Sequence, residues 1–166
     1  HGIALVTEDR KADGIVAGMT IAENITLPNL QAISSHQIMK LKEENSFSEK
    51  YFNDLKIKAP SLNTLLQQLS GGNQQKVVLA KWMARHPKVL ILDEPTRGID
   101  VSTKYEIYKI MVSLAKSGVG IIMISSELPE LMSMADTIMV ISNKRITGTL
   151  KADEFSQEKI MELSAL

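Results

Sequence analysis

Two adjacent carboxylates follow an apolar stretch in the sequence VLILDEPTRGID, where Asp93 and Glu94 come directly after Val89–Leu92. A short apolar run is typical of a buried strand, and ligands of open α/β sheets bind outside the carboxyl ends of the strands. One acid at such a place can hold Mg²⁺, directly or through water. The next can act as a general base or position a water that attacks a γ-phosphate. A polar strand exit that only solvates a turn is the alternative; the continuation Pro-Thr-Arg-Gly-Ile-Asp favours the functional interpretation.

A serine and two glycines open a predicted helix in LQQLSGGNQQKVVLAKWMA, which runs from Leu66 to Ala84. Free amides and the dipole at a helix start favour an anion, glycines allow close backbone approach, and the Ser70 hydroxyl adds a donor. No glycine in the chain is followed by lysine, so the usual phosphate loop that ends in Gly-Lys-Ser/Thr is missing. Ser70, Gly71 and Gly72 therefore form half of a phosphate site. A capped helix without a ligand is the alternative, but Gly-Gly is a poor helix opening unless something must come close.

Composition limits the class of protein. The 166 residues suit one domain, and 44% of them are apolar, which is enough for a packed core. The net charge of zero argues against a basic surface for nucleic acid. The absence of cysteine excludes a disulfide framework and a thiolate metal site, and it fits the cytosol. No apolar run approaches the ~18 residues of a membrane span, and the first residues are not a signal peptide. Because the chain opens almost inside a strand, we expect a piece of a longer protein.

Apolar strands alternate with helices along the chain. Strands are predicted at Ile3–Thr7, Lys88–Asp93, Val119–Ser125, Thr137–Ile141 and Arg145–Leu150, the last two on either side of a turn at Asn143 and Lys144. Helices are predicted between Met19 and Leu66, with polar joints at SSHQ, KEENS and APSLN, and at Gly71–Arg85 with Ser70 as the N-cap. Further helices are predicted from the Asp100 cap to Lys116, at Glu127–Met134 around Pro129, and after Asp153, which is expected to cap the last helix. Continuous apolar strands between helices predict an α/β fold with a parallel or mixed sheet covered on both faces.

The motifs LSGGNQQKV and LILDEPTRGID resemble the signature motif and the Walker B motif of ABC transporter ATPases. The resemblance covers nearly the whole chain. The stretch GIALVTEDRKADGIVAGMTIAENITL is similar to the opening of the helical subdomain in monosaccharide importers for ribose, galactose and xylose. TRGID and ISSELPE resemble the second, C-terminal ATPase domain of their two-domain ATPase subunit. The resemblance implies a partial P-loop NTPase fold over 1–166, without Walker A, with a helical subdomain at about 19–72 and the remaining nucleotide-binding core at 1–18 and 73–166.

The same resemblance implies ATP and Mg²⁺ as ligands. ABC domains dimerise head to tail, so the signature motif would complete the ATP site of a partner domain that holds the nucleotide on its own lysine loop. The implied nucleotide-binding residues of this motif are Ser70, Gly71, Gly72, Asn73 and Gln74. In the site that belongs to this chain, Asp93 would bind Mg²⁺ and Glu94 would be catalytic. Asp100 resembles the D-loop that crosses the dimer interface, and it can cap the following helix as well.

Two positions depart from the family pattern. Most ABC domains end the strand that matches Ile121–Ser125 with a histidine that contacts the γ-phosphate, and Ser126 stands there in this chain. Serine cannot take the charged role of an imidazole, and its other expected role is N-cap of the next helix. Glu8 stands where the family has a glutamine that can bind Mg²⁺ and act as a hinge sensor. It could keep the ligand oxygen, or it could be an exposed acid that pairs with Arg10.

These departures predict an asymmetric pair of ATP sites. The site served by Asp93 and Glu94 would be impaired, and the site completed by Ser70 would work. In the full transporter, Gly72→Asp is expected to stop sugar-driven ATP turnover, whereas Glu94→Gln is expected to be milder.

Two other classes of function can be weighed. A catalytically degenerate module would only dimerise with and regulate a partner ATPase domain; Ser126 favours it, and the Asp93–Glu94 pair argues against it. A chromosome- or repair-type ABC ATPase would carry long heptad coiled coils before the signature, but that span is only about fifty residues and has no sustained heptads.

The resemblance also implies the partners. These are the N-terminal ATPase domain of the same polypeptide or a second copy, membrane permease subunits that contact the helical subdomain, and, indirectly, a periplasmic or extracellular sugar-binding protein. Nucleic acid is not expected among them. The implied location is the cytoplasmic face of a bacterial membrane. The imported sugar is not encoded here, because the solute does not touch this subunit.

The remaining candidates are expected to be structural. Arg97 is predicted to be a solvated or interface charge, and His36 and His86 are predicted at the surface. The stripe predicted to be core comprises Tyr105, Tyr108, Met111, Val112 and Ala115.

Overall fold

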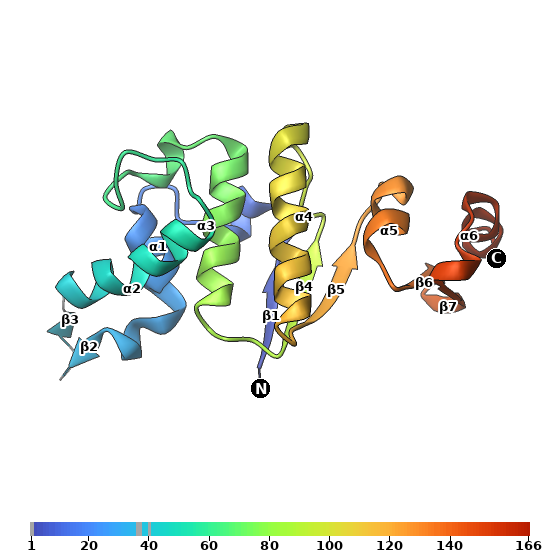
Figure 1. Ribbon diagram of the computed structural model, residues 1–166, viewed down its shortest axis with the longest axis horizontal. Helices are drawn as coiled ribbons and strands as arrows, with labels where there is room; N and C mark the ends of the chain where they lie inside the picture. Colours follow the sequence, from blue (N-terminus) through green and yellow to red (C-terminus); the bar gives the residue numbers. More distant parts are fainter. Residues whose placement is uncertain (1, 36–37, 40) are drawn as a thin grey trace. The chain divides into compact units, whose positions relative to one another are not determined.

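The computed structural model describes residues 2–35, 38–39 and 41–166 (Figure 1). The chain divides into two compact units, His1–Ile124 and Ser125–Leu166. No helix in the described part is both long enough and apolar enough to cross a membrane. His36, which was expected at the surface, lies outside the described residues.

A parallel three-stranded sheet forms the centre of the first unit, in the order β1 (Ile3–Val6), β4 (Val89–Asp93) and β5 (Gly120–Ile124). Its middle strand carries the carboxylates at its carboxyl end. The strands pair through consecutive backbone positions without a bulge, which is what the apolar, β-branched runs favour. The predicted α/β fold with a parallel sheet is confirmed.

Helices α3 (Gly71–Met83) and α4 (Val101–Lys116) lie on one side of this sheet (Figure 1). The buried strand side chains are Ala4, Val6, Leu90 and Leu92. Side chains that point to the opposite face stay exposed, namely Ile3 at 64%, Leu5 at 44%, Ile122 at 52% and Ile124 at 49%. The expectation that both faces are covered is therefore wrong for the described residues, because both helices pack on the same face.

The segment before α3 is helical, as predicted, but its boundaries differ. It contains η1 (Arg10–Gly14), α1 (Ile21–Thr26), η2 (Leu27–Ala32), β2 (Ser34–Ser35), β3 (Ile38–Met39), α2 (Leu41–Asp54) and η3 (Leu66–Gln68). Thr20 and Glu23 form a capping box that starts α1. The polar stretch KEENS was expected to be a joint, but it lies inside α2. Four of its residues are exposed, and the buried Glu44 accepts a hydrogen bond from the Thr26 hydroxyl at 2.8 Å.

Helix α4 begins at the Asp100 cap, as predicted, and ends before Gly118, whose φ of +94° suits a glycine. Its buried residues are Ile107 and Met111. Tyr105 is 61% exposed and Val112 is 42% exposed, so the predicted core stripe is correct only at Met111 and wrong for these two. The exposed Ala115 departs from the predicted stripe as well. The helix is rotated about its axis relative to that prediction.

The second unit contains α5 (Leu128–Met134), β6 (Thr137–Ser142), β7 (Arg145–Lys151), η4 (Ala152–Glu154) and α6 (Gln157–Ser164). Strands β6 and β7 pair antiparallel, as a hairpin whose turn residues Asn143 and Lys144 both have positive φ. Ile160 of α6 joins a small apolar core from this hairpin, made of Ile138, Val140 and Leu150. The predicted cap of the last helix is wrong, since Asp153 lies in η4 and Ser156 caps α6.

Candidate functional site

The turn at the start of α3 exposes the hydroxyl of Ser70. Ser70 occupies the N-cap position with an extended backbone, but its side chain does not cap the helix. Its Oγ instead accepts a hydrogen bond from Nδ2 of Asn73 at 3.0 Å. The N-cap position is thus confirmed and the side-chain cap is wrong. The Ser70 hydroxyl is therefore not used by the first amides of its own helix, in contrast to an ordinary serine cap.

The two glycines of this turn have neighbours within the chain. A Cβ at Gly71 would lie 2.6 Å from a terminal guanidinium nitrogen of Arg10, which is the far end of a flexible side chain. A Cβ at Gly72 would lie 2.5 Å from Cγ2 of Thr103 on α4, which is close to the backbone and stiff. The close packing of α3 against α4 therefore requires a glycine at position 72. At position 71 a small side chain could be accommodated if the end of the Arg10 side chain moved.

The next two residues of the motif differ in how they are placed. Asn73 is half-buried, and its Oδ1 accepts the backbone N–H of Lys58 at 2.8 Å. Gln74 is only 7% exposed, and its Nε2 donates to the carbonyls of Leu66 and Leu69, each at 3.2 Å. Gln74 therefore holds the η3 turn against α3, and its role as a nucleotide ligand stays a prediction.

A buried lysine in α3 was missed by the sequence interpretation. Lys76 is 2% exposed, and its Nζ donates to the carbonyl of Lys56 at 3.0 Å and pairs with Glu106 at 2.7 Å. The hydrogen bond from Lys76 lowers the pKa of the Glu106 carboxyl. The only signal in the sequence is a lysine placed between residues of a helix that is apolar on most faces. Lys76 ties the segment after α2 to α4 behind the signature turn.

The carboxylates at the end of β4 are held by the sheet. Asp93 pairs with Ile124 of β5, and the N–H of Glu94 donates to the carbonyl of Ile124 at 2.9 Å. Glu94 has a φ of +46°, in the left-handed region that a residue with a side chain seldom adopts. Its carbonyl accepts the N–H of Arg97 at 3.1 Å, which closes a tight turn. Backbone strain of this kind accumulates at functional sites, where the surrounding structure enforces it.

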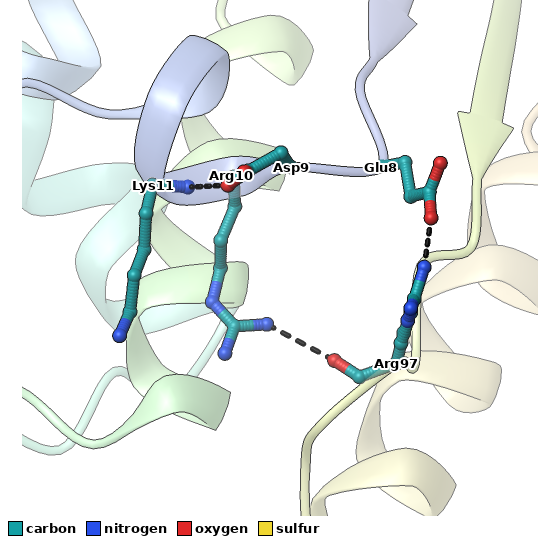
Figure 2. Close-up of a pocket in the computed structure, with 5 residues that line it drawn as sticks. All are labelled: Glu8, Asp9, Arg10, Lys11 and Arg97. Carbon is teal, nitrogen blue, oxygen red and sulfur yellow. Dashed lines mark hydrogen bonds and ion pairs between the residues drawn. The ribbon is translucent and has the colours of Figure 1, made fainter.

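A pocket of about 500 Å³ lies beside these turns and is lined by Glu8, Asp9, Arg10, Lys11 and Arg97 (Figure 2). The carboxylate of Glu8 forms an ion pair with the guanidinium of Arg97, so its partner is Arg97 and not Arg10. Arg97 is therefore a paired charge. Arg10 reaches the same loop from the other side and donates to the Arg97 carbonyl at 3.2 Å (Figure 2). Partial burial lowers the pKa of the Arg10 guanidinium, an effect opposed by the charge of Asp9.

Both carboxylate oxygens of Asp100 accept hydrogen bonds from the first residues of its own helix. It accepts hydrogen bonds from the Ser102 hydroxyl at 2.5 Å, the Thr103 hydroxyl at 2.7 Å and the Thr103 N–H at 2.9 Å. These hydrogen bonds, that of Ser102 first, hold the pKa of Asp100 well below its ordinary value. The predicted helix cap is confirmed, and a contact across a dimer interface stays a prediction.

Ser126 belongs to the second unit, and its predicted role as the cap of α5 is wrong. Glu127 occupies the N-cap position there, and Ser125 accepts the Glu127 N–H at 3.1 Å. The Ser125 hydroxyl in turn donates to the carboxylate of Glu130 at 2.5 Å. His86, at a positive φ of 49°, is exposed, as predicted.

The Ser70 turn and the end of β4 offer different polar groups, which suit different ligands. The Ser70 turn presents a hydroxyl and helix-terminal amides, which suit anionic oxygens. The β4 exit presents Asp93 and Glu94, which suit a cation or the protons of water. Among the described residues no group of three or more acidic, histidine or cysteine side chains could hold a metal. Mg²⁺ at phosphate sites is commonly bound by one or two carboxylates together with phosphate oxygens. Asp93 offers one carboxylate at the end of β4, whereas the carboxylate of Glu8 is engaged by Arg97, so Mg²⁺ binding by either residue stays a prediction.

Solved structures share this fold. An ATP-binding cassette, MJ0796, in a dimeric post-hydrolysis state with ADP and Pi has a TM-score of 0.74 at 21% identity, covering 92% of this chain and 64% of that chain. The cassette MJ1267 of an ABC transporter has a TM-score of 0.79 at 21% identity, covering 98% of this chain and 68% of that chain. At this identity the likeness concerns the fold.

Sequence relatives are closer. The xylose import ATP-binding protein XylG of Thermoanaerobacter pseudethanolicus is 53% identical over 97% of this chain and 32% of its own length. The L-arabinose transport ATP-binding protein AraG of Geobacillus stearothermophilus is 53% identical over 98% of this chain and 32% of its own length. The ribose import ATP-binding protein RbsA of Bacillus cereus is 49% identical over 98% of this chain and 33% of its own length. The chain thus spans about a third of the curated relatives it matches.

The sequence pattern of the family described as ABC transporter matches residues 1–97, which is more than half of the chain. This span contains the Ser70 turn, the buried helix α3 and the two carboxylates at the end of β4. The chain therefore belongs to the ABC transporter family.

Proposed function

We propose that this chain is part of the ATPase subunit of a monosaccharide importer, and that it couples ATP binding and hydrolysis to sugar uptake. The relatives that match nearly all of the chain are named as import or transport ATP-binding proteins for xylose, arabinose and ribose. The likeness to the second, C-terminal ATPase domain of such subunits supports assignment to that half. The helical segment at about 19–72 would be the subdomain that contacts a membrane permease.

In this proposal the signature turn completes an ATP site in trans. The observation that carries the proposal is the exposed Ser70 hydroxyl, which its own helix does not use as a cap, at the start of a helix whose following residues are buried. Helix-terminal amides and a hydroxyl suit the γ-phosphoryl group of a nucleotide that a partner domain holds on its own lysine loop. The partner would be the N-terminal ATPase domain of the same polypeptide or a second copy.

The β4 exit would serve the other ATP site. Asp93, with Glu8, would hold Mg²⁺, which neutralises charge on the phosphate oxygens when it is bound. Glu94 would orient or deprotonate the attacking water, and its strained turn fixes the direction of its side chain. Since Arg97 already pairs with Glu8, binding of a metal by Glu8 would have to displace that guanidinium. Asp100 would face the dimer interface while it caps α4.

A second candidate function follows from one residue. Ser126 stands where most ABC domains have a histidine, and a serine cannot supply an imidazolium to the γ-phosphate. The site served by Asp93 and Glu94 would then be degenerate, and this half would dimerise with its partner and regulate it.

The proposed location is the cytoplasmic face of a bacterial cell membrane, where the chain would be held through the permease. A sugar-binding protein would be an indirect partner.

One titration tests the proposal. The chain is titrated with MgATP alone, and then together with a sugar-import ABC domain that carries a lysine loop and a substitution that blocks hydrolysis. We expect no tight binding by the chain alone and ATP-dependent association in the mixture, and Ser70→Ala should weaken that association. Tight ATP binding by the isolated chain, or association that does not depend on ATP, would contradict completion in trans.

A further inference from the structure

We propose that Asn73 is a positioning residue that sets the direction of the Ser70 hydroxyl, so that its proton is presented to the phosphoryl group. This inference rests on the proposed function of the signature turn. It gives Asn73 a role through Ser70, because both ends of the Asn73 amide are engaged within the chain.

The orientation of the Asn73 amide follows from its first partner. The oxygen and nitrogen of an asparagine amide are assigned from their hydrogen-bond network. A backbone N–H can only donate, so the atom that faces the N–H of Lys58 at 2.8 Å must be Oδ1. The NH₂ group of Asn73 therefore faces Ser70, and its Nδ2 lies 3.0 Å from Oγ.

The direction of the Ser70 hydroxyl follows from the Asn73 amide. A hydroxyl has one proton and two lone pairs, and Asn73 donates to one lone pair. The proton of Ser70 cannot point at Asn73, because an NH₂ group offers no acceptor. Within the described part of the chain, the Ser70 side chain also does not accept from the first amides of α3. The exposed hydroxyl and these amides are then all donors on one turn, which matches a phosphoryl group, whose oxygens are all acceptors.

The segment after α2 keeps this arrangement in place. Lys56 has a φ of +50°, and its carbonyl accepts from the buried Nζ of Lys76 at 3.0 Å. Two residues later, the N–H of Lys58 holds Asn73. Helix α3 thus fixes this segment at two points, and the segment in turn fixes the amide that directs Ser70. The direction of the Ser70 hydroxyl in the signature turn therefore depends on the segment that follows α2.

A double-mutant cycle tests the inference in the ATP-dependent mixture described above. We expect Ser70→Ala and Asn73→Ala each to weaken MgATP-dependent association about tenfold, the size of one lost hydrogen bond to a charged group. The double variant should be no weaker than Ser70→Ala within about twofold, because Asn73 acts only through the hydroxyl. Asn63→Ala, the same substitution at an exposed asparagine, is the matched control and should not change association.

Asn73→Asp is the second variant, and it protects the test against loss of folding. An aspartate keeps an acceptor for the Lys58 N–H but presents an oxygen to Ser70, so the hydroxyl must turn its proton inwards. We expect it to weaken association at least as much as Asn73→Ala, with an unchanged thermal unfolding midpoint.

The outcomes separate the two proposals. Additive losses in the double variant, about a hundredfold, would show that Asn73 acts independently of Ser70 and would overturn this inference alone. Wild-type association by Asn73→Asp would also overturn it. If Ser70→Ala has no effect, the signature turn does not hold the nucleotide, and the proposed function fails together with the inference.

Discussion

The signature turn and the β4 exit are built in opposite ways. The Ser70 turn is held by side chains, since Asn73 and Gln74 tie it to neighbouring backbone. The β4 exit is held by the sheet, since the backbone N–H of Glu94, a residue with a positive φ, donates to β5. One turn presents donors and the other presents acceptors. A phosphoryl group needs the first, and a cation or an attacking water needs the second.

The two turns of one chain therefore do not have to serve one ligand. Donor-rich turns bind anions, and carboxylates within about 4–6 Å of an anion would repel it. A fold that keeps both sets therefore suits an assembly in which each set meets the complementary half from a partner. The consequence is that substitutions in the two turns should have separable effects.

The largest expected effect concerns ATP turnover in the full transporter. Gly71→Asp places a carboxylate at the anion-binding end of α3 and should reduce sugar-driven ATP turnover by about 10²-fold or more. Glu94→Gln should be milder, less than about tenfold, because the asymmetry proposed above makes the site served by Asp93 and Glu94 the impaired one. Gly71 is preferred to Gly72 for this test, because a side chain at position 72 would also clash with Thr103 and so disturb the packing of α3 on α4. Steady-state ATPase rates with sugar-loaded binding protein measure both, and equal losses would contradict the asymmetry.

The next effect separates packing from ligand binding within the same turn. Gly72→Ala places a methyl group where Cγ2 of Thr103 already lies, and it should lower the free energy of unfolding by about 1–3 kcal/mol. Gly71→Ala should be close to neutral, because only the end of the Arg10 side chain must move. Urea denaturation of the chain measures both values.

Thr103→Ser provides the control for that pair. It removes Cγ2 and keeps the hydroxyl that donates to Asp100. In the Thr103→Ser background, Gly72→Ala should lose most of its destabilising effect. If the effect persists, the clash with Thr103 is not its cause.

A smaller effect concerns the support behind the signature turn. Lys76→Met keeps the apolar stem but leaves the Lys56 carbonyl without its donor and Glu106 without its cation. We expect a loss of about 1–2 kcal/mol in the free energy of unfolding, since Glu106 is partly exposed and its pairing is screened. Lys42→Met, at an exposed position, is the control and should change stability by less than about 0.5 kcal/mol. Equal unfolding midpoints for the two variants would show that the buried lysine contributes nothing.

The smallest effect is a dependence on pH. The pKa of Asp100 is lower in the folded state than in the unfolded state, where it is about 4. The ionised carboxylate therefore contributes stability above that pH, and the contribution is lost as the pH falls through the lower pKa of the folded state. Asp100→Asn should therefore flatten the fall in stability between about pH 4 and pH 2, without a change in the slope near pH 7. Chemical denaturation at several pH values compares the slopes. Identical slopes would rule out Asp100 as a source of acid sensitivity.

Local chemistry explains which features could be predicted. The Asp100 cap and the Asn143–Lys144 turn depend on residues close in sequence, and both are confirmed. The predictions of a core stripe on α4 and of a sheet covered on both faces were wrong, because each depends on which elements pack against a face. The cap assignments at Ser126 and Asp153 failed by one and three positions, since neighbouring polar residues compete for the same helix start.

Residue types and spacing are enough to predict the alternation of apolar strands and helices, the donor-rich turn at Ser70 and the paired acids after β4, because they act locally on secondary structure and on ionisable groups. The pairing of Glu8 with Arg97, the burial of Lys76 and the position of Asn73 between Lys58 and Ser70 become visible only in the folded chain. These contacts join segments that are distant along the chain or that face each other only after α3 has packed. Their geometry depends on the packing of whole elements, which the local sequence does not contain.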